Sequence, residues 1–135
     1  MTTDLRDFSG QVVLLVGAAS GIGRSAAQLI ASRGATVVIA DLDQVGLSSL
    51  QSDLGINANQ VKSVDMSDQK SIQALVANVI SEHGQIDAVV NTAGIVGPTN
   101  TKLEDVDWAI FEKNSRNQLV RNNLVNTGCY SAYEI

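Results

Sequence analysis

Val12-Val-Leu-Leu-Val-Gly-Ala-Ala-Ser-Gly-Ile-Gly-Arg24 is the stretch of the sequence that decides the fold. Its first five residues are apolar, which is typical of a buried parallel strand. Three glycines follow, at positions 17, 21 and 23, and then an apolar pattern at helical spacing, at Ile22, Ala26, Leu29 and Ile30. A strand, a glycine-rich turn and a helix in this order predict the phosphate-binding corner of a dinucleotide-binding fold.

Each glycine has a separate predicted role in that corner. Gly17 allows a tight turn at the strand end, Gly21 allows the backbone to approach a pyrophosphate, and Gly23 allows the helix to pack closely on the strand. The free N–H groups and the positive end of the helix dipole then face the anion. A tight strand–helix turn without a ligand is the alternative, because glycine-rich turns are common.

The rest of the chain alternates strands and helices. Residues 55–60 are predicted to form a turn, and Ser67 and Asp68 to act as N-cap and first-turn acid of a helix. Strands that alternate with helices predict an α/β fold with a parallel sheet and helices on both faces. The predicted strands are 11–16, 36–40, 61–64 and 86–90, and the predicted helices are 21–33, one from 41–43 to about 54, one from 67–68 to Gly84, and one from about 102.

Two motifs in the chain resemble those of a known protein family. Gly17-Ala-Ala-Ser-Gly-Ile-Gly23 resembles the cofactor motif of the short-chain dehydrogenase/reductase family, and Asn91-Thr-Ala-Gly94 resembles its second motif, usually Asn-Asn-Ala-Gly. The resemblance covers about residues 8–112. It implies a Rossmann-type sheet of about four strands in the order 3-2-1-4, with the cofactor across the carboxyl ends of strands 1 and 4.

The resemblance also implies which residues contact the cofactor. Asp65 would meet the adenine amino group and Met66 would pack on the ring, although Asp65 could instead be a turn former at a strand end. Asn91 would hold the backbone that places Ala93 and Gly94 against the cofactor. The predicted cofactor-binding residues are Gly17, Ser20, Gly21, Ile22, Gly23, Asp41, Leu42, Asp65, Met66, Asn91, Ala93 and Gly94.

Asp41 indicates which nicotinamide cofactor is preferred. It follows the second predicted strand, 18 residues after Gly23, close to the spacing of the acidic residue that meets the adenosine ribose. Its carboxylate can accept hydrogen bonds from both ribose hydroxyls and would repel a 2′-phosphate. Relatives that prefer NADP often have Arg or Lys at the positions of Ser20 or Leu42. NAD is therefore favoured over NADP, although Asp41 could also serve as the N-cap of the next helix.

The acid–base pair of the family is absent from these 135 residues. Family catalysis uses a Tyr and a Lys four residues later, which lowers the Tyr pKa. Here Glu134 stands four residues after Tyr130, Tyr133 has no such partner, and the last lysine is Lys113. The Asn of the family relay would fall near Asn114 or Ser115, where a solvated helix end is the alternative. We therefore assign no catalytic residue.

Composition restricts the partners and the compartment. A net charge of −5 argues against non-specific nucleic-acid binding, and no apolar run is long enough to span a membrane. Cys129 is the only cysteine, so a reducing, cytoplasmic location is expected. One histidine, His83, and one cysteine make no metal site. The helix at 102–113, or an exposed edge of the fourth strand, could form a homo-oligomer contact.

These observations predict residues 1–113 as an NAD-binding domain and residues 114–135, with five asparagines in 22 residues, as a divergent irregular tail. The expected function is that of an oxidoreductase of the NAD-dependent alcohol/ketone class that is inactive alone. The alternatives are a non-catalytic nucleotide-binding or dimer-partner protein, and a non-functional truncated product of a longer enzyme.

Overall fold

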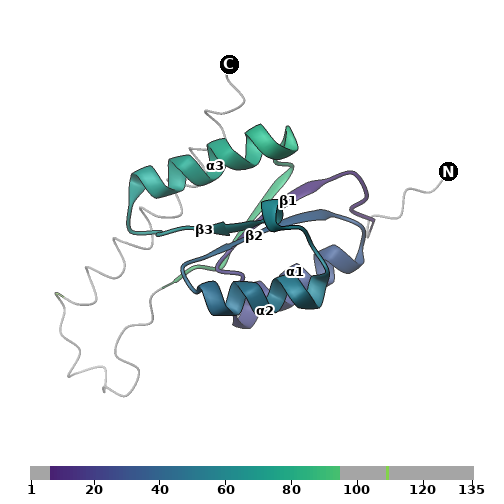
Figure 1. The fold of residues 1–135 in the computed structure, drawn as a ribbon, viewed down its shortest axis with the longest axis horizontal. Helices are drawn as coiled ribbons and strands as arrows, with labels where there is room; N and C mark the ends of the chain where they lie inside the picture. Colours follow the sequence, from purple (N-terminus) through teal and green to yellow (C-terminus); the bar gives the residue numbers. More distant parts are fainter. Residues whose placement is uncertain (1–6, 95–108, 110–135) are drawn as a thin grey trace.

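The computed structural model describes residues 7–94 and Ala109, and shows helices packed on a central sheet (Figure 1). Ala109 has helical backbone conformation. Apart from Ala109, the predicted helix from about 102 lies outside the described residues, as do the boundary at 113, the tail and both tyrosines. The elements are β1 (Val12–Val16), α1 (Gly21–Ser32), β2 (Thr36–Asp41), α2 (Gln44–Leu54), the short 3₁₀ helix η1 (Ala58–Gln60), β3 (Val61–Ser63), α3 (Gln69–His83) and β4 (Ala88–Asn91).

The four strands form one sheet in the order β3-β2-β1-β4, and the three strand pairs are all parallel. Val13 pairs with Val37 of β2 on one side and with Ala88 of β4 on the other. The predicted α/β class and the strand order are therefore confirmed. In this order the chain reverses its direction of winding at β1, so β1 and β4 flank the point where a crevice opens at the carboxyl ends.

The sheet is covered on both faces. Figure 1 shows α3 on one face and α1 and α2 on the other. Because side chains alternate along a strand, Leu14 and Val16 pack with α3, whereas Val13 and Leu15 pack with α1 and α2. All five residues of β1 are buried, which explains why this strand is a continuous apolar run.

Capping residues set where the helices begin and end. Asp43 and Asp68 are the N-caps of α2 and α3, and each carboxylate accepts backbone N–H bonds of the first turn. Gly55 and Gly84 end the same helices in the left-handed conformation. The prediction that Ser67 is the N-cap of α3 was wrong, because the Ser67 hydroxyl donates to Asp65 instead. The predicted turn at 55–60 contains η1.

The apolar residues that recur at helical spacing in α1 do not all lie on its buried face. Ile22 is 80% exposed and Leu29 is 52% exposed, whereas Gly23 and Ala27 are the buried residues of this helix. Small side chains face the sheet because the start of α1 lies against the turn at Gly17, where larger ones would not fit. None of the helices among residues 7–94 is long and apolar enough to cross a membrane.

Candidate cofactor site

A cavity of about 810 Å³ opens where the four parallel strands end. Residues that follow β1, β2, β3 and β4 all contribute to it, together with the first turn of α1. Its volume lies within the range of about 300–1,000 Å³ found for small-molecule sites. The lining residues are Val16, Gly17, Ser20, Gly21, Ile22, Gly23, Asp41, Leu42, Val64, Asp65, Met66, Ser67, Thr92, Ala93 and Gly94.

The cavity gathers every predicted cofactor-binding residue except Asn91. Asn91 lies beside it, and its side-chain oxygen accepts the Ala93 N–H at 3.1 Å. Four further residues that were not predicted as site residues also line the cavity: Val16, Val64, Ser67 and Thr92. Their positions directly beside predicted site residues were the available signal.

The glycine turn is packed so closely that side chains are excluded from it. A Cβ atom at Gly17 would lie 2.6 Å from the Ala93 nitrogen, and one at Gly23 would lie 2.1 Å from the Gly17 carbonyl oxygen. Gly17 and Gly21 also have positive φ angles of 84° and 55°. A Cβ at Gly21 would meet no atom within 4 Å, so this glycine faces open space. The turn therefore presents bare backbone to the cavity.

Thr92 holds this turn from the neighbouring strand. Its N–H donates to the Val16 carbonyl at 2.8 Å, and its hydroxyl lies 3.1 Å from the Val16 oxygen and 3.2 Å from the Gly17 oxygen. The same hydroxyl oxygen would be 2.4 Å from a Cβ at Gly23. Thr92, which differs from the Asn of the motif, thus packs the end of β4 against both the turn and α1.

The N-terminus of α1 has the features of an anion site. Its first intrahelical hydrogen bond joins the Arg24 N–H to the Ser20 carbonyl, so the amides of residues 21–23 precede the helical ladder. The Ser20 side chain makes no capping hydrogen bond, and the first turn has no acidic residue. By contrast, α2 and α3 have aspartate caps. The positive end of the α1 dipole therefore faces the cavity without an acidic residue in the first turn of the helix itself.

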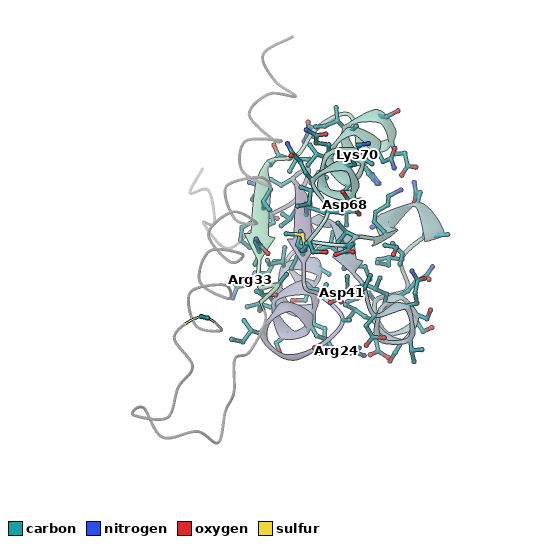
Figure 2. All side chains as sticks on the ribbon, turned by 90° about the vertical axis from the view of Figure 1, so that its left-hand side faces the viewer. Arg24, Arg33, Asp41, Asp68 and Lys70 are labelled. Atoms are coloured by element: carbon teal, nitrogen blue, oxygen red, sulfur yellow. The ribbon has the colours of Figure 1, made fainter. Side chains whose placement is uncertain are left out.

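Asp41 links the end of β2 to this loop. Its Oδ2 atom accepts the Ala19 N–H and its Oδ1 atom accepts the Asp43 N–H, both at 3.0 Å. Figure 2 shows Asp41 between Arg24 and Asp68 in this view of the molecule. The N-cap of α2 is Asp43 and not Asp41, so this alternative role of Asp41 was wrong. A carboxylate has about four acceptor positions, and two backbone bonds leave capacity for hydroxyl donors.

Asp65 and Met66 form the opposite wall. The Asp65 Oδ1 atom accepts both the N–H and the hydroxyl of Ser67, at 2.8 and 2.6 Å. Asp65 is therefore a turn former, as the alternative predicted, and it also lines the cavity. Met66 is 9% exposed and belongs to the core cluster beneath α3, so an apolar surface lies beside this carboxylate.

The charged side chains that line the described cavity are acidic. Asp41 and Asp65 are the charged residues that line it, and Lys and Arg are absent from its lining within the described part of the chain. Any phosphate here would therefore depend on backbone amides and the α1 dipole. Residues 7–94 also contain no group of three or more His, Cys, Asp or Glu side chains that could hold a metal ion.

Comparisons with known proteins agree with this geometry. Residues 17–119 match a family model described as enoyl-(acyl carrier protein) reductase. Over 106 residues the chain is 31% identical to short-chain dehydrogenase reductase 5 of Arabidopsis thaliana, covering 78% of this chain and 40% of the relative. The chain belongs to the short-chain dehydrogenase/reductase family.

Two further relatives are named as dehydrogenases. The mitochondrial borneol dehydrogenase of Lavandula x intermedia is 35% identical over 112 residues, which cover 83% of this chain and 42% of the relative. The solved citronellol catabolism dehydrogenase of Pseudomonas aeruginosa superposes with a TM-score of 0.78 at 29% identity, covering 94% of this chain and 52% of that one. The chain spans about half or less of the length of these family members, which bind nicotinamide dinucleotides as a family.

Proposed function

We propose that these residues form the NAD-binding part of an oxidoreductase that acts on an alcohol or a ketone. The observation that carries the proposal is the pairing of an uncapped α1 N-terminus with the Asp41 carboxylate on one cavity. The residues fit the cofactor, because the turn is too closely packed for a Cβ at Gly17 or Gly23 and Gly21 faces open space, so bare backbone is available to approach a pyrophosphate. When bound, the cofactor supplies the hydride-transferring nicotinamide ring.

The individual roles follow from this placement. Amides of residues 21–23 would bind the pyrophosphate, and Asp41 would accept hydrogen bonds from the adenosine ribose. Asp65, Met66 and Leu42 would enclose the adenine, whereas Ser20 and Ile22 would border the phosphates. Asn91 would act indirectly, since it holds the Ala93 amide and so places Ala93 and Gly94.

NAD is proposed over NADP on electrostatic grounds. A 2′-phosphate would have to lie near the Asp41 carboxylate, and no lysine or arginine lines the described cavity to offset the repulsion. The alcohol or ketone class is supported by a relative that is named borneol dehydrogenase and by one that is named a citronellol catabolism dehydrogenase. The single cysteine of the sequence supports a reducing, cytoplasmic location.

A second candidate is nucleotide binding without turnover. The observation that favours it is that no Tyr in these 135 residues is followed four positions later by Lys. An assay of NADH oxidation on a panel of carbonyl compounds, run beside NADH binding by fluorescence, separates the two. Binding without oxidation by the 135-residue chain supports the second candidate, whereas oxidation supports an enzyme that uses other acid–base groups.

The proposal is tested with Asp41→Asn, and Asp43→Asn serves as the matched control. Both substitutions remove one carboxylate charge, but only Asp41 lines the cavity, and Asn caps α2 about as well as Asp. We expect Asp41→Asn to weaken NADH binding about tenfold, a loss of about 1.4 kcal/mol, and to raise the affinity for NADPH relative to NADH. Asp43→Asn should change neither quantity. Unchanged affinities for both cofactors in Asp41→Asn would refute the ribose-binding role.

A further inference from the structure

Arg24 connects three parts of the molecule behind the glycine turn. Its Nη1 atom lies 3.5 Å from the Ala19 carbonyl oxygen and 3.4 Å from the Gly46 carbonyl oxygen. Its Nη2 atom donates to the Ser49 hydroxyl at 3.1 Å and forms an ion pair with Asp53. The guanidinium group therefore joins α1 to the turn that precedes it and to three residues along one side of α2, Gly46, Ser49 and Asp53.

Ala19 is held from both sides as a result. The peptide group before its Cα donates to Asp41, through the Ala19 N–H at 3.0 Å, and the peptide group after it accepts from Arg24. Fixing the two peptide planes that flank one Cα fixes both backbone dihedral angles of that residue. The direction in which the chain enters Ser20 and the α1 N-terminus is thereby determined.

Close packing of α2 completes this arrangement. A Cβ at Gly46 would lie 2.8 Å from the Ala19 Cβ and 3.0 Å from the Ala19 oxygen. Gly46 lowers the helix propensity of the first turn of α2, but because it has no side chain it allows α2 to pack against the loop at Ala19. Arg24 provides the polar contact at the same junction, because it bonds the carbonyl groups of both Ala19 and Gly46.

Stability alone does not account for Arg24. Its side chain is 24% exposed and that of Asp53 is 49% exposed. Ion pairs with this exposure contribute little to the free energy of unfolding. A planar guanidinium can direct separate N–H groups at Ala19, Gly46, Ser49 and Asp53, whereas the ammonium of lysine is a compact point charge. The arrangement therefore favours a geometric role.

We propose that Arg24 is a positioning residue for the dinucleotide site. It holds the 18–21 loop in the conformation that presents the α1 amides to the pyrophosphate and the Ala19 N–H to Asp41. The inference rests on the proposed function, since it assigns a residue outside the cavity to the binding of the same cofactor. In the view of Figure 2, Arg24 lies below Asp41.

The test measures dissociation constants of NADH and of ADP-ribose for the 135-residue chain and three variants. ADP-ribose carries the adenosine and both phosphates but no nicotinamide, so it reports on this part of the site alone. We expect Arg24→Met to bind both ligands about tenfold more weakly at a temperature where the variant is folded. Arg24→Lys retains the charge beside Asp53, so it should melt close to the wild-type temperature. It should nevertheless bind both ligands more weakly than the wild type.

Lys62→Met is the matched control. Lys62 forms an ion pair with Glu82, at side-chain exposures of 15% and 39%, on β3 and α3 rather than at the glycine turn. The Lys62→Met variant should lower the melting temperature by about as much as Arg24→Met does, and it should leave the dissociation constants of NADH and ADP-ribose unchanged.

Each outcome decides the inference. If the Arg24→Met variant binds NADH and ADP-ribose as tightly as the wild type does, Arg24 only joins two helices and the positioning role is refuted. If Arg24→Met does not fold, Arg24→Lys decides, and wild-type affinity in that variant overturns the positioning role. Loss of affinity in Lys62→Met as well would also overturn it. A wild-type chain that binds neither ligand would refute the proposed function itself, and the inference with it.

Discussion

Replacing Gly23 with alanine tests the packing of the glycine turn most directly. In an ordinary helix interior this change stabilises the protein by about 1 kcal/mol, because alanine has the higher helix propensity. Here the added Cβ would lie 2.1 Å from the Gly17 oxygen and 2.4 Å from the Thr92 hydroxyl oxygen. The first distance is roughly 1.3 Å below ordinary van der Waals contact, and the obstacle is backbone.

The magnitude follows from three contributions. Overpacking costs about 1–3 kcal/mol, and the upper end applies because a carbonyl group has to move. Displacing Thr92 removes hydrogen bonding with the Val16 and Gly17 carbonyl groups, worth about 1 kcal/mol. Subtracting the gain in helix propensity of about 1 kcal/mol leaves a net destabilisation of about 2–3 kcal/mol. For a chain of this size that lowers the melting temperature by roughly 10 °C.

The assay is a thermal melt followed by circular dichroism, with Ser25→Ala as the control. Ser25 lies on the exposed face of the same helix, so alanine there should keep or slightly raise the melting temperature. Gly23→Ala should also reduce the upward shift caused by NADH, since the Gly17 carbonyl moves with the turn. A Gly23→Ala chain that melts at or above the wild-type temperature would refute the close-packing argument.

Two further predictions concern local hydrogen bonds. Asp43→Ala removes an acceptor that lies 3.1 Å from both the Val45 and Gly46 amides. It should therefore lower the free energy of unfolding by about 1 kcal/mol in a denaturant titration, whereas Asp43→Asn should not. An equal loss in both variants would contradict the capping role. The hydroxyl of Ser9, and then its N–H, lower the pKa of Asp7 from its usual value. Ser9→Ala should therefore raise that pKa in an NMR titration, and an unchanged midpoint would count against the hydrogen bond as the cause. Because the folded-state pKa is the lower one, these hydrogen bonds stabilise fully above the usual pKa and are lost as the pH falls through the folded-state value.

The sequence predicted the strand–turn–helix corner because its signals are local. Five apolar residues, three glycines and a helical pattern lie within one short stretch, and each reports on backbone conformation or burial without reference to the rest of the chain. The same holds for Gly84 at the end of α3 and for Asp41 at the end of β2. Alternation of strands and helices then restricted the topology to a parallel sheet with helices on both faces.

Helical periodicity failed where packing distance mattered more than hydrophobicity. Ile22 and Leu29 belong to the apolar pattern at helical spacing, yet the buried residues of α1 are Gly23 and Ala27. A helix that starts beside the Gly17 carbonyl has no room for large side chains there. Ile22 is instead exposed at the cavity, where a bound cofactor would cover it.

The sequence by itself thus determined the fold class, the family and most of the residues that surround the cavity, because these depend on local conformation and on the solvation of repeating patterns. Only the tertiary structure decided what shapes the glycine turn. Arg24 and Gly46 meet across 22 residues of sequence, and Thr92 and Gly17 across 75. Such contacts exist only after the crossover connections have brought separate strands and helices together, so no pattern along the chain could predict which side chain would hold the turn.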